Sequence, residues 1–132
     1  MTHYDQPVRA FMTEAVHTIS LETSLPTARR KMEELNVRHL PVLDGSTLVG
    51  LLSERDLGKL EGFPMVDLNV VSTADAMSEK PYVVSPDTPV VEVVRTMRDN
   101  RYGSAIVADN GKVVGMFTAT DGLSILIQLL TR

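Results

Sequence analysis

The segment Gly50-Leu51-Leu52-Ser53-Glu54-Arg55-Asp56 decides the fold, because its pattern returns later in the chain as Gly115-Met116-Phe117-Thr118-Ala119-Thr120-Asp121. The two segments lie 65 residues apart, and the same offset aligns residues 8–56 with 73–121 without a gap. A constant offset over such a length is typical of an internal repeat. The chain is therefore predicted to contain one fold unit twice. Identical residues at this offset include Met12 and Met77, Ser20 and Ser85, Arg30 and Arg95, Asp44 and Asp109, and Val49 and Val114.

Each copy carries the pattern of a strand, a helix, two strands and a second helix. Apolar residues spaced three and four apart predict a helix that begins near Leu25, where Thr23 and Ser24 can cap it, and another near Val90, where Thr88 can cap it. Turn residues such as Asp109-Asn110-Gly111 predict a hairpin between the last two strands. The predicted fold class is α/β (α+β), with two pseudo-symmetric β-α-β-β-α repeats packed sheet to sheet. The predicted strands are 16–20, 40–43 and 48–52 in the first copy and 82–85, 105–108 and 112–117 in the second.

The duplication also predicts the domain boundaries. The first repeat is expected at residues 8–60 and the second at 73–130, and Gly62 and Pro64 mark a connector at 61–72. Because one copy is small, each is expected to bury its open face against the other.

The composition is that of a globular protein and excludes several classes of function. The chain has 132 residues, 43% hydrophobic and 23% charged, which is ordinary for a globular protein. The absence of cysteine excludes disulfides, thiolate metal sites and nucleophilic thiols. A net charge of −4 disfavours a general nucleic-acid binder. We see no signal peptide and no apolar run long enough for a bilayer, so we expect a cytoplasmic location without membrane contact.

The sequence gives little support for catalysis. The motifs Gly-x-Ser-x-Gly and His-Glu-x-x-His are absent. The histidines, His3, His17 and His39, lack the spacing of metal ligands. We therefore expect neither an enzyme nor a metal site, and no catalytic cofactor.

The duplicated motif resembles the CBS domain, named after cystathionine beta-synthase. Matching marks are Phe11-Met12-Thr13 and Ala76-Met77-Ser78 at the repeat starts, and His39-Leu40-Pro41-Val42-Leu43-Asp44 before the first hairpin turn. The resemblance covers residues 8–128 and implies a tandem pair, called a Bateman module, with two clefts between the repeats. It further implies that the clefts bind AMP, ADP, ATP or S-adenosylmethionine, that modules dimerise, and that they regulate an enzyme or transporter. We expect a stand-alone pair.

The Ser/Thr-x-x-Asp segments suggest how a nucleotide is held. A helix that begins where a strand ends has unpaired N–H groups and a positive dipole end, which suit a phosphate. The Thr118 hydroxyl can donate to a phosphate or ribose oxygen, and the Asp121 carboxylate can accept both ribose hydroxyls. The same spacing also fits a helix capping box, which stabilises a helix by about 1 kcal/mol without any ligand. Both interpretations stay open.

The two copies differ in charge around this segment. The first has Arg38-His39 before its strand and Arg55 at the helix start, where the second has Gly103-Ser104 and Thr120. The resemblance implies that Arg38 and His39 contact the ligand phosphate. Alternatively, Arg38 is a solvated surface charge and His39 is a polar residue at the end of a strand. Glu54 would repel a phosphate unless it points away. The resemblance also places the adenine wall at Thr18, Ile19 and Pro41, or at Val83, Val84 and Ile106. The candidate ligand-binding residues are Thr18, Arg38, His39, Pro41, Ser53, Arg55, Asp56, Val83, Ser104, Ile106, Thr118, Thr120 and Asp121.

The last helix is apolar around most of its circumference, with Ile125 and Leu129 off its main apolar face. Such a helix is expected to be buried on more than one side, either by a second subunit or by the N-terminal segment 8–12. We expect a homodimeric regulatory sensor of an adenosine compound, which acts on an unidentified partner protein by a ligand-dependent conformational shift. The alternatives are a ligand-independent dimeric scaffold and a module for another ligand, such as a metal or nucleic acid. The main apolar face is formed by Leu123, Leu126, Ile127 and Leu130.

Overall fold

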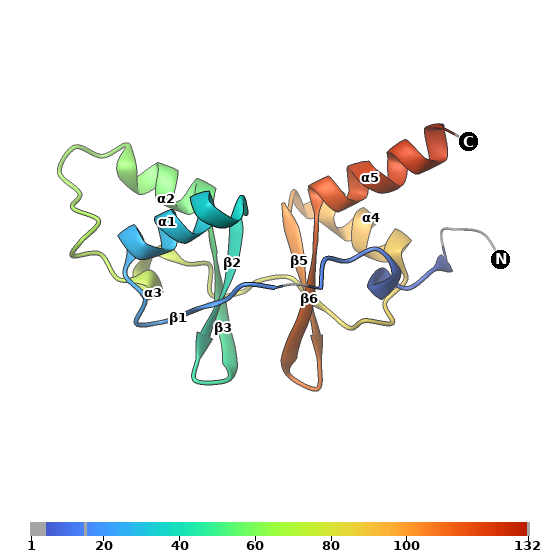
Figure 1. Ribbon diagram of the computed structural model, residues 1–132, viewed down its shortest axis with the longest axis horizontal. Helices are drawn as coiled ribbons and strands as arrows, with labels where there is room; N and C mark the ends of the chain where they lie inside the picture. Colours follow the sequence, from blue (N-terminus) through green and yellow to red (C-terminus); the bar gives the residue numbers. More distant parts are fainter. Residues whose placement is uncertain (1–4, 15, 132) are drawn as a thin grey trace. The chain divides into compact units, whose positions relative to one another are not determined.

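The computed structural model describes residues 5–14 and 16–131, which fall into two compact units (Figure 1). One unit comprises residues 17–81, and the other combines the described residues up to 16 with residues 82–131. Each unit contains a three-stranded sheet and helices, so the predicted mixed α/β class is confirmed.

The unit 17–81 is built on the sheet order β1-β2-β3. Strand β1 pairs parallel with β2, and β2 pairs antiparallel with β3. In Figure 1, α1 and α2 lie on one side of the β2–β3 hairpin. The elements are β1 (Ile19–Ser20), α1 (Leu25–Leu35), β2 (His39–Asp44), β3 (Thr47–Ser53), α2 (Glu54–Glu61) and α3 (Thr73–Ala76).

The other unit repeats this topology with the sheet order β4-β5-β6. Strand β4 pairs parallel with β5, and β5 pairs antiparallel with β6. Each hairpin has a register shift at the equivalent place, between Val42 and Leu43 and between Val107 and Ala108. The elements are the 3-10 helix η2 (Val8–Ala10), β4 (Val83–Val84), α4 (Val90–Asn100), β5 (Ser104–Asp109), β6 (Lys112–Thr118) and α5 (Ala119–Leu130).

Local sequence explains most element ends. Asn110 and Gly111 both have positive φ, 52° and 80°, which is the backbone of the tight hairpin turn that their residue types predict. The Ser24 side chain accepts a hydrogen bond from the Thr27 N–H and caps α1 as predicted. The predicted Thr88 cap is wrong, because Pro89 is the N-cap of α4 and makes no side-chain bond there. Thr88 instead accepts a hydrogen bond from the Ser85 N–H, at 3.2 Å.

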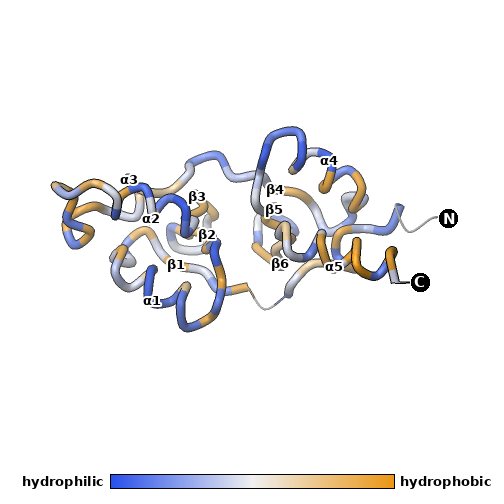
Figure 2. Tube along the Cα trace, turned by 90° about the horizontal axis from the view of Figure 1, so that it is seen from above, coloured by the Kyte–Doolittle hydropathy of each residue, from blue (hydrophilic) through white to orange (hydrophobic). Residues whose placement is uncertain are grey.

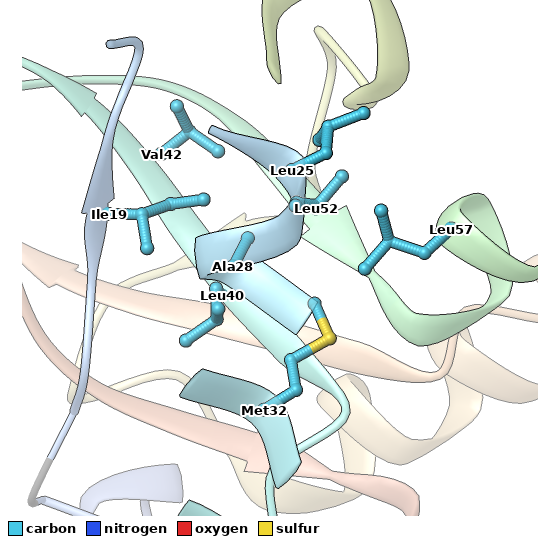
Figure 3. Close-up of a cluster of buried hydrophobic side chains, with 8 residues drawn as sticks. All are labelled: Ile19, Leu25, Ala28, Met32, Leu40, Val42, Leu52 and Leu57. Carbon is cyan, nitrogen blue, oxygen red and sulfur yellow. The ribbon is translucent and has the colours of Figure 1, made fainter. Parts of the chain in front are cut away.

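Each unit has its own apolar core. In the unit 17–81, α1 packs onto the sheet and onto Leu57 of α2, and Figure 3 shows these side chains gathered around Ala28. The equivalent core in the other unit contains Val93 of α4, Phe117 of β6 and Val8 of η2. The first core consists of Ile19, Leu25, Ala28, Met32, Leu40, Val42, Leu52 and Leu57.

The segment that leads into each copy packs on the unit of the other copy. Thr13 forms an antiparallel bridge with Met116 of β6, while Ser78 forms the equivalent bridge with Leu51 of β3. The backbone hydrogen bonds are 2.8 and 2.9 Å for the first pair and 3.0 and 2.9 Å for the second. The segments 5–14 and 73–78 therefore complete units to which the repeat pattern does not assign them.

This exchange explains the glycine at the start of the duplicated motif. A Cβ added at Gly50 would lie 2.5 Å from the Met77 sulfur, and one added at Gly115 would lie 2.5 Å from the Met12 sulfur. Real Cβ atoms do not approach other atoms so closely. Glycine lets the leading segment lie directly on the strand.

The apolar face of α5 is exposed, and Figure 2 marks apolar residues along this helix in orange. Its side chains are 48–73% exposed, whereas Ile125 packs against the core that contains Val8. The described N-terminal residues therefore pack on the Ile125 side of α5 but leave this face exposed. None of the described helices combines the length and apolar character needed to span a membrane. The exposed residues are Leu123, Leu126, Ile127 and Leu130.

Candidate functional site

Both Ser/Thr-x-x-Asp segments form complete capping boxes. The Ser53 hydroxyl accepts the Asp56 N–H at 3.1 Å, and Asp56 Oδ2 accepts the Ser53 N–H at 2.9 Å. The Thr118 hydroxyl accepts the Asp121 N–H at 3.4 Å, and Asp121 Oδ2 accepts the Thr118 N–H at 2.9 Å. The capping interpretation is therefore confirmed at both helices. Each box occupies mainly one carboxylate oxygen, Oδ2.

The capping boxes reduce the number of N–H groups that a phosphate can use. The Glu54 N–H donates to the Arg38 carbonyl at 2.8 Å, and the Ala119 N–H donates to the Gly103 carbonyl at 3.1 Å. In the described part of the chain, this leaves the Arg55 and Thr120 N–H groups without a partner in the first helical turns. Each helix start thus offers one backbone donor.

Strand pairing places a residue of the adjacent strand next to each helix cap. His39 is opposite Ser53 in the β2–β3 register, and Ser104 is opposite Thr118 in the β5–β6 register. Ser104 is only 4% exposed, and its hydroxyl has no hydrogen-bond partner among the described residues. A buried polar atom without a partner is uncommon in a native protein and calls for an explanation, such as an absent water or ligand.

His39 occupies the equivalent position in the first copy. Burial lowers the pKa of His39 below its ordinary value, and the Arg38 charge acts in the same direction. The carboxylates of Asp56 and Glu54 oppose this effect without reversing it. His39 is therefore neutral at neutral pH, and an added anion nearby would favour its protonated form.

The basic residues of the first copy lie at the surface. Arg38 Nε is 3.9 Å from Glu54 Oε2, and the Arg38 side chain is 82% exposed. Glu54 thus lies toward Arg38, and the positive charge of Arg38 offsets part of the negative charge of Glu54. Arg55 is exposed and has no ion pair in the described ranges. Thr120, its equivalent, is also exposed.

The predicted adenine-wall residues lie on the edge strands β1 and β4 and on the strands paired with them, except Thr18, which directly precedes β1. Val83 is paired with Ile106, which is fully buried, whereas Val83 is 43% exposed. Pro41, the equivalent of Ile106, is also fully buried. The Thr18 carbonyl accepts a hydrogen bond from Lys31 Nζ at 2.9 Å.

The structure divides the candidate residues between the two units. Within the described residues, no group of three or more His, Cys, Asp or Glu side chains can hold a metal ion. His3 lies outside the described residues. The unit 17–81 holds Thr18, Arg38, His39, Pro41, Ser53, Arg55 and Asp56. The other unit holds Val83, Ser104, Ile106, Thr118, Thr120 and Asp121.

Thr13 contacts the candidate site although sequence reasoning did not assign it there. Its hydroxyl donates to Asp121 Oδ1 at 3.3 Å, across a separation of 108 residues. The repeated Met-Thr and Met-Ser pairs at the repeat starts were a signal that these segments matter. They do not indicate that Thr13 meets Asp121, because that contact depends on the exchange of segments.

Comparisons with known proteins agree with this architecture. The family model of the CBS domain matches residues 8–60 and 73–127. The uncharacterized protein YlbB of Bacillus subtilis is 34% identical over 116 residues, which cover 86% of this chain and 78% of that protein. A crystal structure of an uncharacterized conserved protein from Pyrococcus horikoshii has a TM-score of 0.83 at 26% identity, and covers 96% of this chain and 95% of that one. The structure of CBSX2 in complex with AMP has a TM-score of 0.79 at 27% identity, covering 94% and 98%.

Proposed function

The chain belongs to the CBS domain family, and from this premise we propose that it is a regulatory module that binds an adenosine compound at the starts of α2 and α5. The ligand is AMP, ADP, ATP or S-adenosylmethionine. CBSX2, a relative in structure at 27% identity, was crystallised with AMP, which supports this class of ligand. The proposed module is not an enzyme, needs no catalytic cofactor and acts in the cytoplasm.

The buried hydroxyl of Ser104 is the observation that carries the proposal. It lies opposite Thr118 in the strand register and lacks a partner among the described residues. A ligand oxygen at this place would satisfy Ser104 Oγ, and the Thr120 N–H is a donor at the start of α5, where the Thr118 hydroxyl caps the helix. Asp121 Oδ1 remains outside the capping box and can accept a ribose hydroxyl.

In the first copy, the basic residues Arg38 and His39 stand at the positions of Gly103 and Ser104 in the second copy. We propose that His39 and Arg38 face the ligand phosphate, with Ser53 and the Arg55 N–H at the helix start and Asp56 on the ribose. The adenine ring lies against Thr18 and Pro41 here. In the second copy it lies against Val83 and Ile106.

The proposed mechanism is a shift between two arrangements of the chain. A ligand favours one arrangement by its differential affinity for the two, and an unidentified partner protein prefers that arrangement. We further propose that a second copy of the chain covers the apolar face of α5. This face presents Leu123, Leu126, Ile127 and Leu130 at helical spacing, and a continuous exposed apolar stripe is typical of a protein interface.

Thermal unfolding with and without ligand tests the proposal. Free AMP, ADP, ATP or S-adenosylmethionine at 100 times its dissociation constant adds about 2.7 kcal/mol to the free energy of unfolding, which raises the melting temperature by several degrees. Asp121→Asn and Asp56→Asn should each remove the contribution of one site, and the double variant should remove the shift. If no ligand moves the wild-type melting temperature at millimolar concentration, the ligand-independent scaffold is the better description.

A further inference from the structure

The carboxylates of Asp56 and Asp121 have different numbers of free acceptor positions. An ionised carboxylate offers about four lone-pair positions. Asp121 accepts the Thr118 N–H at 2.9 Å, the Thr118 hydroxyl at 3.3 Å and the Thr13 hydroxyl at 3.3 Å. Asp56 accepts the Ser53 N–H at 2.9 Å and has no further hydrogen bond within the described ranges. Oδ1 of Asp56 therefore accepts no hydrogen bond from a described residue, whereas Oδ1 of Asp121 accepts one from the Thr13 hydroxyl.

The backbone of Thr13 is fixed by its pairing with β6. Two backbone hydrogen bonds, of 2.8 and 2.9 Å, fix Thr13 to Met116 of β6. Met12 packs against Gly115 beside it, and the β-branched side chain of threonine has few rotamers. Ser78, the residue equivalent to Thr13, has the same backbone pairing with Leu51 but makes no side-chain bond to Asp56.

We propose that Thr13 is a specificity-determining residue that limits Asp121 to one ribose hydroxyl, so that the second-copy site does not distinguish ribose from 2′-deoxyribose, whereas the first-copy site does. This inference rests on the proposed function. Asp56 Oδ1 and the rest of its carboxylate can accept both hydroxyls of a ribose cis-diol. With Thr13 in place, Asp121 has about one acceptor position left, which a single 3′-hydroxyl fills as well as a diol does.

Calorimetric binding of AMP and 2′-deoxy-AMP to the full chain tests the inference. In an Asp56→Asn background, which leaves the Asp121 site, the two probes should bind with affinities within about threefold of each other. Adding Thr13→Val removes the Thr13 hydroxyl and frees one acceptor position of Asp121. The affinity for AMP should then rise about tenfold, as expected for one added hydrogen bond from the 2′-hydroxyl to a charged group. The affinity for 2′-deoxy-AMP should stay unchanged. Thr13→Ser, which keeps a hydroxyl, should leave the ratio near one.

The first-copy site supplies the matched control. In an Asp121→Asn background, AMP should bind about tenfold more tightly than 2′-deoxy-AMP, and Ser78→Ala should leave this ratio unchanged. A general loss of structure in Thr13→Val would weaken both probes equally, so the ratio separates a role in specificity from a role in folding.

The outcomes distinguish this inference from the proposed function. If wild type binds neither probe, the proposed function fails and this inference fails with it. If wild type binds AMP but Asp56→Asn does not, or if Thr13→Val leaves the ratio of the two affinities unchanged, the inference is overturned while the proposed function stands.

Discussion

Substitution of the motif glycines tests the exchange of leading segments. A Cβ at Gly50 would lie 2.5 Å from the Met77 sulfur and 2.7 Å from the Ser78 carbonyl oxygen. At Gly115 it would lie 2.5 Å from the Met12 sulfur but 3.0 Å from the Thr13 carbonyl oxygen. A methionine side chain can turn away, whereas the Ser78 carbonyl is held by its hydrogen bond to the Leu51 N–H. Gly50→Ala should therefore cost more than Gly115→Ala.

The expected losses in the free energy of unfolding come from overpacking around the added Cβ and from opening of the backbone bridge that Ser78 or Thr13 forms with its strand. Overpacking costs about 1–3 kcal/mol, and a backbone bridge that must open loses about 1 kcal/mol for each hydrogen bond. We expect Gly50→Ala to lower the free energy of unfolding by about 3 kcal/mol and Gly115→Ala by about 1–2 kcal/mol. For a chain of this size, the Gly50→Ala loss corresponds to a melting temperature lower by on the order of 10 °C.

Urea unfolding followed by circular dichroism, together with calorimetry, measures these differences. Gly58→Ala is the matched control, because an added Cβ there meets nothing within 4 Å and lies inside α2, so it should stabilise by about 0.5–1 kcal/mol. Met12→Ala should relieve most of the cost of Gly115→Ala, while Met77→Ala should leave most of the cost of Gly50→Ala. If Gly50→Ala is as stable as wild type, the leading segment does not lie on β3, and the reasoning is refuted.

Further predictions concern pH, assembly and the helix cap. Because burial lowers the pKa of His39, the unfolded chain takes up the proton first as pH falls below about 6.5, so the free energy of unfolding should decrease with falling pH through this window. Urea titrations at pH 7.5 and 5.5 should show a smaller decrease in His39→Gln, and an equal decrease in both proteins would contradict the assignment. Light scattering should give the mass of a dimer for wild type and about half of it for Ile127→Glu, whereas a wild-type mass of 14.5 kDa would refute the dimer. Thr118→Ala should cost about 1 kcal/mol without ligand and Thr118→Ser much less, and equal melting temperatures would argue against the cap.

The duplicated pattern was enough to predict the mixed α/β fold and the paired hairpins, and it gave the capping boxes as one of two interpretations, because each depends on residues close in sequence. The turn at Asn110-Gly111 requires two residues that tolerate positive φ, and the cap at Thr118 requires an acid three residues later. The first strand of each copy is shorter than predicted, two residues in β1 and in β4. The length of an apolar run does not say how many of its residues find a partner on the next strand.

The exchange of segments could not be predicted from the pattern. Similar leading segments precede both copies, so each would fit either unit equally well by composition, and a repeat alignment assigns each to its own copy. The contact of Thr13 with Asp121 depends on that choice. The sequence also could not predict that the Ser104 hydroxyl lacks a hydrogen-bond partner, because this depends on all the atoms that surround the side chain.

The capping box and the proposed ligand site use different oxygens of the same carboxylate, so the two interpretations of Ser/Thr-x-x-Asp are compatible. The box holds Oδ2 through the N–H of the cap residue and thereby fixes the direction in which Oδ1 points. A carboxylate fixed in this way loses little conformational freedom when a hydroxyl binds, which favours binding. The residues that stabilise the helix start without ligand therefore also prepare its acceptor. The difference between the two copies then depends on which neighbour reaches Oδ1: Thr13 at Asp121, and no described residue at Asp56.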